Sequence, residues 1–136
     1  MIKNIEYTTM HGISVNVALH DQITVIGGDS SVGKTFLKDT IQEYCNGIDK
    51  LLVEVFDYKR PIDIGVLKAM RNKLIIIDNA DILLDGNKDI CAYINTDKHN
   101  QYLLFMRSEN DIDVSVENYA ELKRDGKRLF AAYDYR

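Results

Sequence analysis

The most informative stretch of this chain runs from Gly27 to Thr35 and reads GGDSSVGKT. From Gly28 onward it has a glycine, four variable residues, a second glycine, a lysine and a threonine. Glycines let the backbone adopt positive φ and approach a polyanion closely. The successive N–H groups of such a loop form an anion-binding concavity at the start of a helix. The stretch therefore predicts a loop that binds phosphate groups.

The residues on both sides of this stretch predict the strand and the helix that a phosphate-binding loop needs. Residues 22–26 read QITVI, and a run of apolar and β-branched residues is typical of a buried strand. A helix is expected from Thr35 to Cys45, with a stop at Asn46-Gly47. Its apolar residues share one face: Leu37, Ile41, Tyr44 and Cys45. A glycine-rich turn without a ligand is the alternative, and the flanking elements make it the less favoured one.

Individual positions of the loop have expected roles. Lys34 brings a compact positive charge to the β and γ phosphates, and the Thr35 hydroxyl is expected to bind Mg²⁺. The other contacts with a nucleotide are expected from neighbouring residues: Gly28, Asp29, Ser30, Ser31, Val32, Gly33 and Phe36.

The second informative stretch is KLIIID, from Lys73 to Asp78. Its apolar run predicts a buried parallel strand that ends in a carboxylate. Ligands of doubly wound sheets lie at the carboxyl ends of the strands. Asp78 is therefore expected to hold Mg²⁺ through water, as the second acidic element of phosphate-loop enzymes does. A strand that ends in aspartate by accident is the alternative.

The remaining segments predict an α/β domain that spans residues 1–136. Further strands are expected over 2–7, 13–19, 50–57 and 101–106. A short helix is expected to enter at Arg60-Pro61 and to end near residues 71–72, and another helix is expected over 88–94. Asp125-Gly126, between the apolar-rich segments 119–122 and 128–133, predicts a C-terminal β-hairpin.

Composition and charge narrow the classes of partner. The chain is 46% apolar and 28% charged, as is usual for a globular protein, and its net charge of −4 gives no strong overall field for nucleic acid. A local basic cluster surrounds the expected hairpin turn: Lys123, Arg124, Lys127 and Arg128. A solvated hairpin tip explains this cluster more simply, and contact with nucleic acid is the alternative that is not favoured.

The cysteines and the lengths of the apolar runs indicate the cellular compartment in which the protein is expected. Cys45 and Cys91 lie in apolar helical patterns without metal-ligand spacing, so they are expected to be buried thiols in a reducing compartment. The N-terminal segment lacks the apolar core of a signal peptide, and no apolar run has membrane-spanning length. We expect a cytoplasmic protein that makes no membrane contact.

The stretches GDSSVGKT and LIIID together resemble the Walker A and Walker B motifs of the P-loop NTPase superfamily, over about Ile23 to Ser108. The resemblance implies a three-layer α/β fold with a mostly parallel sheet, preceded by N-terminal antiparallel strands. The expected strands between and after the motifs look like the branch with an additional central strand, which contains AAA+ and cassette ATPases. The chain also looks like small bacterial or mobile-element ATP-binding proteins that end in a hairpin.

The same resemblance assigns roles to residues beyond the two motifs. It implies that Ser108, which follows the strand QYLLFM, senses the γ-phosphate, with an ordinary strand exit as the alternative. Neutralisation of phosphate charge by Arg107, in its own site or in a neighbour's, is a less favoured possibility. Many hydrolysing relatives place a glutamate directly after the metal-side aspartate, whereas this chain has Asn79, which cannot act as a base. Asp81 is a substitute water activator if the chain turns helical immediately.

These observations predict a protein that binds ATP and Mg²⁺ and hydrolyses ATP slowly, with Lys34, Asn79 and Asp81 as the catalytic candidates. A nucleotide-dependent protein-binding module or inhibitor with negligible hydrolysis is the alternative. No cassette signature, helical lid or arginine-rich kinase lid is found in the sequence, and no guanine-recognition motif of the Asn-Lys-x-Asp type favours GTP. Besides the nucleotide, a protein partner or self-association is expected.

Overall fold

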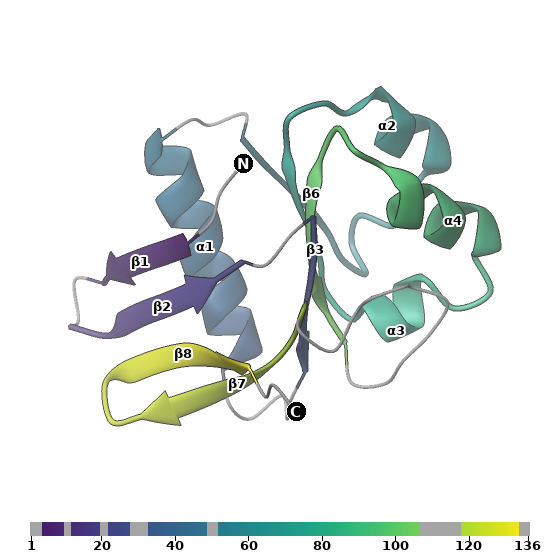
Figure 1. The fold of residues 1–136 in the computed structure, drawn as a ribbon. Helices are drawn as coiled ribbons and strands as arrows, with labels where there is room; N and C mark the ends of the chain where they lie inside the picture. Colours follow the sequence, from purple (N-terminus) through teal and green to yellow (C-terminus); the bar gives the residue numbers. More distant parts are fainter. Residues whose placement is uncertain are drawn as a thin grey trace.

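The structure is a computed structural model that describes residues 4–9, 12–19, 22–27, 33–48, 52–106 and 118–133. Over these ranges the chain forms an α/β fold with eight strands and four helices (Figure 1). In chain order the elements are β1 (Asn4–Thr8), β2 (Ser14–Ala18), β3 (Ile23–Gly27), α1 (Lys34–Ile48), β4 (Val53–Phe56), α2 (Ile64–Ala69), β5 (Leu74–Ile77), α3 (Ala80–Leu83), α4 (Lys88–Thr96), β6 (Gln101–Phe105), β7 (Tyr119–Asp125) and β8 (Arg128–Tyr133).

All described strands belong to one mixed sheet with the order β1-β2-β8-β7-β3-β6-β5-β4. The five strands from β7 to β4 run parallel to one another. The pairs β1/β2 and β7/β8 are antiparallel, and β2 joins β8 in parallel. Each strand expected from the sequence is present, with ends shifted by a few residues, and the expected C-terminal hairpin is confirmed.

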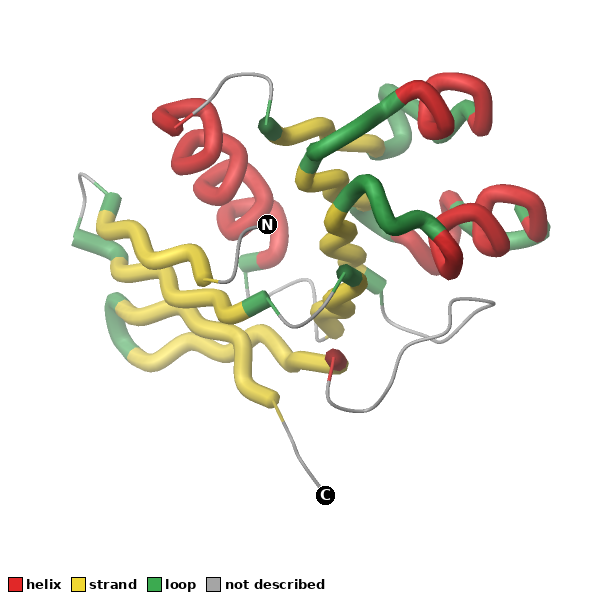
Figure 2. The backbone as a smooth tube through the Cα atoms, turned by 45° about the horizontal axis from the view of Figure 1, so that its top comes forward, coloured by secondary structure: helices red, strands yellow, loops and turns green. Residues whose placement is uncertain are grey.

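Helices cover both faces of the sheet, and the sheet curls around α1 (Figure 2). Both edge strands, β1 and β4, contact α1. At the β1 edge the Tyr7 hydroxyl donates a hydrogen bond to the Glu43 carboxylate at 3.3 Å. The other three helices, α2, α3 and α4, lie on the opposite face (Figure 1). The middle of the sheet is therefore shielded from water on both faces.

The two faces carry separate apolar cores, and alternation along β5 shows how one strand serves both. Leu74 and Ile76 pack on the α1 side, whereas Ile75 and Ile77 pack on the side of the other helices, and all four are buried. Such a continuously apolar strand is expected for parallel strands covered on both faces. In α1, the residues Leu37, Ile41 and Cys45 are fully buried, which confirms the predicted helical face. Both cysteines are buried free thiols, as expected.

Helix ends are where the sequence predictions were wrong. The helix α1 continues through Asn46-Gly47 to Ile48 instead of stopping there, because the buried stripe that holds it on the sheet outweighs the helix cost of one glycine, about 1 kcal/mol. The helix α2 begins at Ile64 and not at Pro61, since Asp63 is the N-cap and accepts a hydrogen bond from the Gly65 N–H at 3.1 Å. The short helix α3 was not predicted.

The C-terminal hairpin is inserted between strands that are neighbours in the sequence. Strand β8 pairs with β2, and β7 pairs with β3, so the hairpin fills the space between β2 and β3. At its tip the Ser14 N–H donates to the Lys127 carbonyl at 2.7 Å. At its other end the Tyr133 hydroxyl donates to the Ala18 carbonyl. The start and the end of the described chain are thus bound together in one sheet.

A buried polar cluster joins the end of α4 to β6. The Asp97 Oδ2 accepts hydrogen bonds from the Tyr102 hydroxyl at 2.6 Å and from the Asn100 Nδ2 at 2.8 Å. The Asn100 Oδ1 in turn accepts from the Lys73 N–H at 3.1 Å. Every buried side-chain nitrogen and oxygen atom in the described residues has a hydrogen-bond partner, as is usual in native interiors. The cluster anchors the amino ends of β5 and β6, whose carboxyl ends carry the candidate site.

Among the described residues, no helix has the length and apolar character needed to cross a membrane.

Candidate functional site

The predicted loop connects β3 to α1 at the carboxyl edge of the parallel strands. Strand β3 ends at Gly27 and α1 begins at Lys34. Strand β6 lies between β3 and β5, with Ile26 paired to Phe105 and Leu104 paired to Ile77. The ends of the three strands therefore lie side by side. This edge is where ligands bind in open parallel sheets.

Several residues predicted to contact the nucleotide fall outside the described part of the chain. They are Gly28, Asp29, Ser30, Ser31, Val32, Arg107 and Ser108. The predictions made for them stay predictions.

Gly33 has the backbone conformation that the motif requires of a glycine. Its φ is +109°, a conformation that residues with a side chain rarely adopt. Its carbonyl accepts the Leu37 N–H at 2.9 Å, which is the first hydrogen bond of the α1 ladder. Gly33 is therefore where the chain turns from the loop into the helix.

The first turn of α1 carries the predicted lysine and threonine. Lys34 is the first residue of the helix, and its side chain lies outside the described part of the structure. Thr35 and Phe36 follow it, and both are exposed. The Thr35 hydroxyl is thus available to a ligand at the positive end of the helix dipole.

Asp78 follows β5 directly and its carboxylate is held from two sides. Its N–H donates to the Phe56 carbonyl at 2.9 Å, which extends the pairing of β5 with β4. Its Oδ1 accepts the Asn79 N–H at 3.0 Å. The side chain is 20% exposed, so it is partly accessible to solvent.

The second carboxylate oxygen of Asp78 contacts a residue that was not predicted to belong to the site. Lys38 Nζ lies 3.4 Å from Asp78 Oδ2, and the two side chains are 13% and 20% exposed. Lys38 stands one helical turn after Lys34, and residues four apart share a helix face. This four-residue spacing was the sequence signal that could have identified Lys38 as part of the site. The pair brings the N-terminal half of α1 into direct contact with the end of β5.

Asn79 and Asp81 follow Asp78 at the start of α3. Asn79 is exposed and has φ of 49° and ψ of 49°, a left-handed conformation that asparagine tolerates better than most residues. The helix α3 starts at the next residue, so the condition set for Asp81, an immediate helical turn, is met. Asp81 lies in the first turn and is half-buried. Its role as a water activator is a separate matter that stays a prediction.

The donor set fits Mg²⁺ in its chemistry. The Thr35 hydroxyl and the Asp78 carboxylate are hard oxygen ligands, which Mg²⁺ prefers. No cluster of three or more His, Cys, Asp or Glu side chains suited to a metal was found within the described ranges. A Mg²⁺ ion at this edge would therefore take most of its ligands from phosphate oxygens and water, as it does in many nucleotide sites. In the structure, the ammonium group of Lys38 is the positive charge that lies next to the Asp78 carboxylate.

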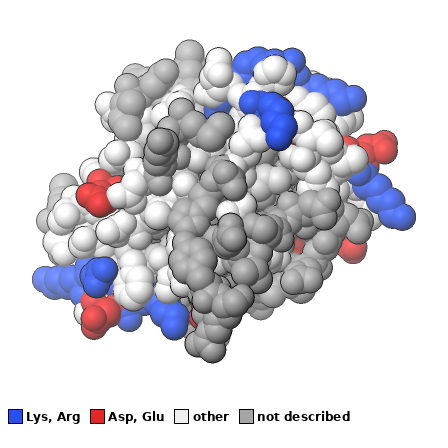
Figure 3. Space-filling model, viewed as in Figure 1, with Lys and Arg blue, Asp and Glu red and all other residues white. Residues whose placement is uncertain are grey.

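The basic cluster of the hairpin tip is exposed and mixed with acidic residues (Figure 3). Lys123 Nζ lies 3.9 Å from Glu121 Oε2, and Asp125 is paired with Arg128 across the hairpin. An exposed pair of this kind contributes little to stability. The tip is solvated and carries both signs of charge. This agrees with the interpretation of the basic cluster as a solvated hairpin tip.

Comparisons of the chain with family models, with curated proteins and with solved structures find no match.

Proposed function

We propose that this protein binds ATP with Mg²⁺ at the carboxyl edge of β3 and β5 and hydrolyses it slowly. The observation that carries the proposal is the contact between Lys38 and Asp78. Through it, the helix that begins with Lys34-Thr35 packs its first turns against the carboxylate that follows β5. This contact joins two residues that are 40 apart in the sequence. It supports a site formed by the start of α1 and the end of β5.

The strand order supports the same proposal. The resemblance to P-loop NTPases implies an additional central strand between the strand before the phosphate loop and the strand before the acidic residue. Strand β6 occupies that position between β3 and β5. The positive φ of Gly33 adds support at the loop itself, because a close backbone approach to phosphate needs a residue without a side chain.

Each residue of the site then has a defined task. The Lys34 ammonium and the N–H groups at the start of α1 would stabilise negative charge on the phosphates. Thr35 and Asp78 would hold Mg²⁺, which when bound neutralises phosphate charge. Asn79 would orient the attacking water through its amide, or Asp81 through its carboxylate, and Ser108 would contact the γ-phosphate.

Slow turnover follows from the residue at position 79. Asparagine cannot accept a proton from water, so position 79 supplies no base, and the site would depend mainly on positioning and electrostatics unless Asp81 activates the water. Absence of a stabilising arginine in comparable enzymes lowers turnover by a factor of about 10³ to 10⁵. A partner protein or a second copy that supplies such a group would raise the rate.

A nucleotide-dependent binding module with negligible hydrolysis is the second candidate. Two observations favour it: Asn79 stands in place of a base, and Ile82, on the helix that follows it, is 72% exposed. An exposed apolar side chain beside a nucleotide site is suited to a protein partner whose binding depends on the bound nucleotide. Both candidate functions require bound ATP, but only the first includes its hydrolysis.

Labelled ATP separates the two candidates. Wild type, Lys34→Ala and Lys88→Ala would be incubated with labelled ATP and Mg²⁺, and the bound label would be resolved into ATP and ADP over several hours. Lys88 is the matched control, since it is also the first residue of a helix and is exposed. Loss of bound label in Lys34→Ala alone would support the site.

The form of the label then decides between the candidates. Accumulation of ADP with wild type and with Lys88→Ala would establish the ATPase. Retained ATP without ADP would establish the binding module. If wild type holds no label, or if Lys34→Ala holds as much as wild type, the proposed site is wrong.

A further inference from the structure

A cavity of about 130 Å³ lies next to the predicted phosphate loop, and no role has been assigned to it so far. Three separate parts of the chain line it: the segment before β2, the start of α1 and the β7–β8 hairpin. The lining residues are Ile13, Gly33, Phe36, Arg124 and Leu129. Gly33 and Phe36 flank Lys34-Thr35, so the cavity borders the residues that are proposed to bind phosphates.

The hairpin is positioned so that two of its side chains reach the cavity together. Arg124 and Leu129 are direct partners across the hairpin, and partners of this kind point to the same face. Leu129 is also the register partner of Val15 in β2, and both are buried in the core on the α1 side. The Arg124 Nε donates to the Gly126 carbonyl at 3.0 Å, which restrains the guanidinium.

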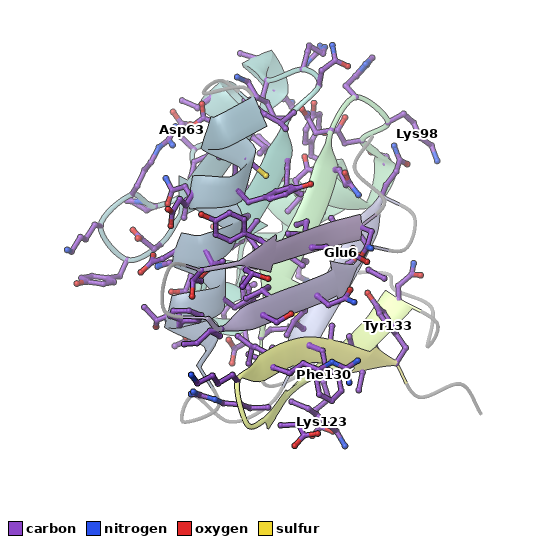
Figure 4. The ribbon with its side chains drawn as sticks, turned by 90° about the vertical axis from the view of Figure 1, so that its left-hand side faces the viewer. Glu6, Asp63, Lys98, Lys123, Phe130 and Tyr133 are labelled. Atoms are coloured by element: carbon purple, nitrogen blue, oxygen red, sulfur yellow. The ribbon has the colours of Figure 1, made fainter. Side chains whose placement is uncertain are left out.

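The adjacent pair on the hairpin points the other way. Lys123 and Phe130 are also partners across the two strands, and Figure 4 shows them together on the hairpin. Because successive side chains of a strand alternate between faces, this pair lies opposite to Arg124 and Leu129. The Phe130 ring carries the Arg128 guanidinium 4.7 Å from its centroid. Lys123 therefore lies on the face opposite to Arg124, and of the described basic residues at the tip Arg124 is the one that lines the cavity.

The α1 side of the cavity is open where a ligand would enter. A Cβ built on Gly33 would meet no atom of the described residues within 4 Å. Phe36 is 38% exposed, which is unusual for a large apolar side chain. A ring bound against Phe36 would cover apolar surface that is now in contact with water.

We propose that this cavity receives the base of the bound nucleotide, which would stack against Phe36 and the Arg124 guanidinium. The inference rests on the proposed function, because it needs the phosphates to lie at the start of α1. An apolar cavity of about 150 Å³ holds one benzene ring, so a cavity of about 130 Å³ has room for roughly one ring of a base, and the rest of a purine would extend into solvent. Both an aromatic ring and a planar guanidinium are good stacking partners for a base.

The lining also predicts how selective the cavity is. Among the described residues that line it, Arg124 is the sole side chain with a polar group, and that group only donates hydrogen bonds. No lining side chain can therefore accept a hydrogen bond from the exocyclic amine of adenine or of guanine. Stacking tolerates any base, so ATP and GTP are expected to bind within about tenfold of each other.

The test compares ligands with and without a base. Binding of ATP, GTP and inorganic tripolyphosphate, each with Mg²⁺, would be measured by calorimetry for wild type, Phe36→Ala, Arg124→Ala and Lys34→Ala. Val66→Ala is the matched control, because Val66 is an apolar helical residue with a similar exposure of 41%. Phe36→Ala and Arg124→Ala are expected to weaken ATP about tenfold and to leave tripolyphosphate within about twofold.

Each outcome has a defined meaning. Lys34→Ala is expected to weaken all three ligands, which reports on the phosphate site independently of the base. If wild type binds ATP and Lys34→Ala does not, but Phe36→Ala and Arg124→Ala bind ATP as wild type does, the cavity does not hold the base and the proposed function stands. Equal weakening of ATP and tripolyphosphate by Phe36→Ala would also overturn the inference. If wild type binds none of the three ligands, the proposed function and the inference both fall.

Discussion

Lys38 Nζ lies 3.4 Å from Asp78 Oδ2, and this ion pair connects the helix after the phosphate-loop motif to the strand that ends in the acidic motif. The two residues come from opposite ends of the site: Lys38 from the second turn of α1 and Asp78 from the end of β5. Both are largely buried, so solvent screens the pair less than it screens surface pairs. The same carboxylate is the proposed partner of Mg²⁺, and Lys38 therefore competes with the metal.

Replacement of Lys38 is expected to change the requirement for Mg²⁺. In Lys38→Met, Asp78 loses its ammonium partner, so half-maximal ATP binding should require several-fold less Mg²⁺ than in wild type. The comparison is a titration of Mg²⁺ at constant ATP concentration. Lys68→Met, in α2, is the control and should leave the requirement unchanged. An unchanged requirement in Lys38→Met would mean that Asp78 takes no part in holding the metal.

The strength of the same pair can be measured in the absence of any ligand. A double-mutant cycle with Lys38→Met and Asp78→Asn isolates the pairwise term from the effects of each change alone. We expect a coupling free energy of about 1 kcal/mol, since the pair is partly exposed and its 3.4 Å separation is longer than an ideal charged hydrogen bond. Chemical denaturation of the four proteins supplies the free energies of unfolding. A coupling near zero would show that the contact contributes nothing to stability.

Two glycines of the same segment should respond oppositely to alanine. At Gly33 and at Gly47 an added Cβ would meet no atom within 4 Å, but Gly33 has φ of +109° whereas Gly47 lies in α1. Gly33→Ala should lower the free energy of unfolding by about 1–3 kcal/mol through backbone strain. Gly47→Ala should raise it by about 0.5 kcal/mol, because alanine favours the helix. Thermal or urea unfolding measures both, and equal effects would contradict the role of φ.

Loss of the Tyr102 hydroxyl is expected to destabilise the amino ends of β5 and β6. The hydroxyl donates to Asp97 Oδ2 at 2.6 Å inside the protein, so Tyr102→Phe removes one donor from a buried carboxylate. The expected loss is about 1–3 kcal/mol in the free energy of unfolding. Tyr58→Phe is the control, since Tyr58 is 79% exposed and its hydroxyl should contribute little. A Tyr102→Phe variant as stable as wild type would mean that the cluster is dispensable.

The buried thiol of Cys45 should make stability fall at alkaline pH. Burial raises the pKa of Cys45 from 9.0 to about 11, because the thiolate is disfavoured in the apolar core. Between these values the unfolded thiol ionises while the folded thiol stays protonated, so the unfolded state binds fewer protons. The contribution of Cys45 is therefore complete below pH 9 and is lost as the pH rises toward 11.

The slope of that loss is the quantity to measure. It should reach about 1.4 kcal/mol per pH unit at most. Urea unfolding of wild type and Cys45→Ala in reductant, from about pH 8 to about pH 10, separates this slope from the constant cost of the smaller side chain. Burial also raises the pKa of Tyr102 above its ordinary value of 10.0, but that contribution is present in both proteins and cancels in the comparison. Parallel curves for the two proteins would contradict the prediction.

Much of the fold follows from local sequence patterns. The run of apolar residues in 74–77 predicts a strand covered on both faces, and the spacing of Leu37, Ile41 and Cys45 predicts the face that α1 buries. Asp125-Gly126 predicts the hairpin, and Gly126 has the positive φ of 60° that such a turn requires. These signals are local because they depend on residues within one or two turns of each other.

The position of the hairpin in the sheet could not be predicted in the same way. Pairing of β7 with β3 and of β8 with β2 joins segments that lie about a hundred residues apart, and periodicity carries no information about which strands pair. The contact of Lys38 with Asp78 was missed for a related reason. The sequence places Lys38 on the helix face of Lys34, but the distance to Asp78 depends on how α1 packs across β6.

The insertion of β7 and β8 between β2 and β3 has a consequence for synthesis on the ribosome. The strands made first leave a gap in the sheet that the last strands must enter, so no strand connects the N-terminal hairpin to the rest of the sheet until β7 and β8 have emerged. Pairing over such sequence separations is slow and leaves strand edges exposed to aggregation. A nascent chain paused before the hairpin should therefore remain a substrate for chaperones, even though four of the five parallel strands, β3, β4, β5 and β6, are already made.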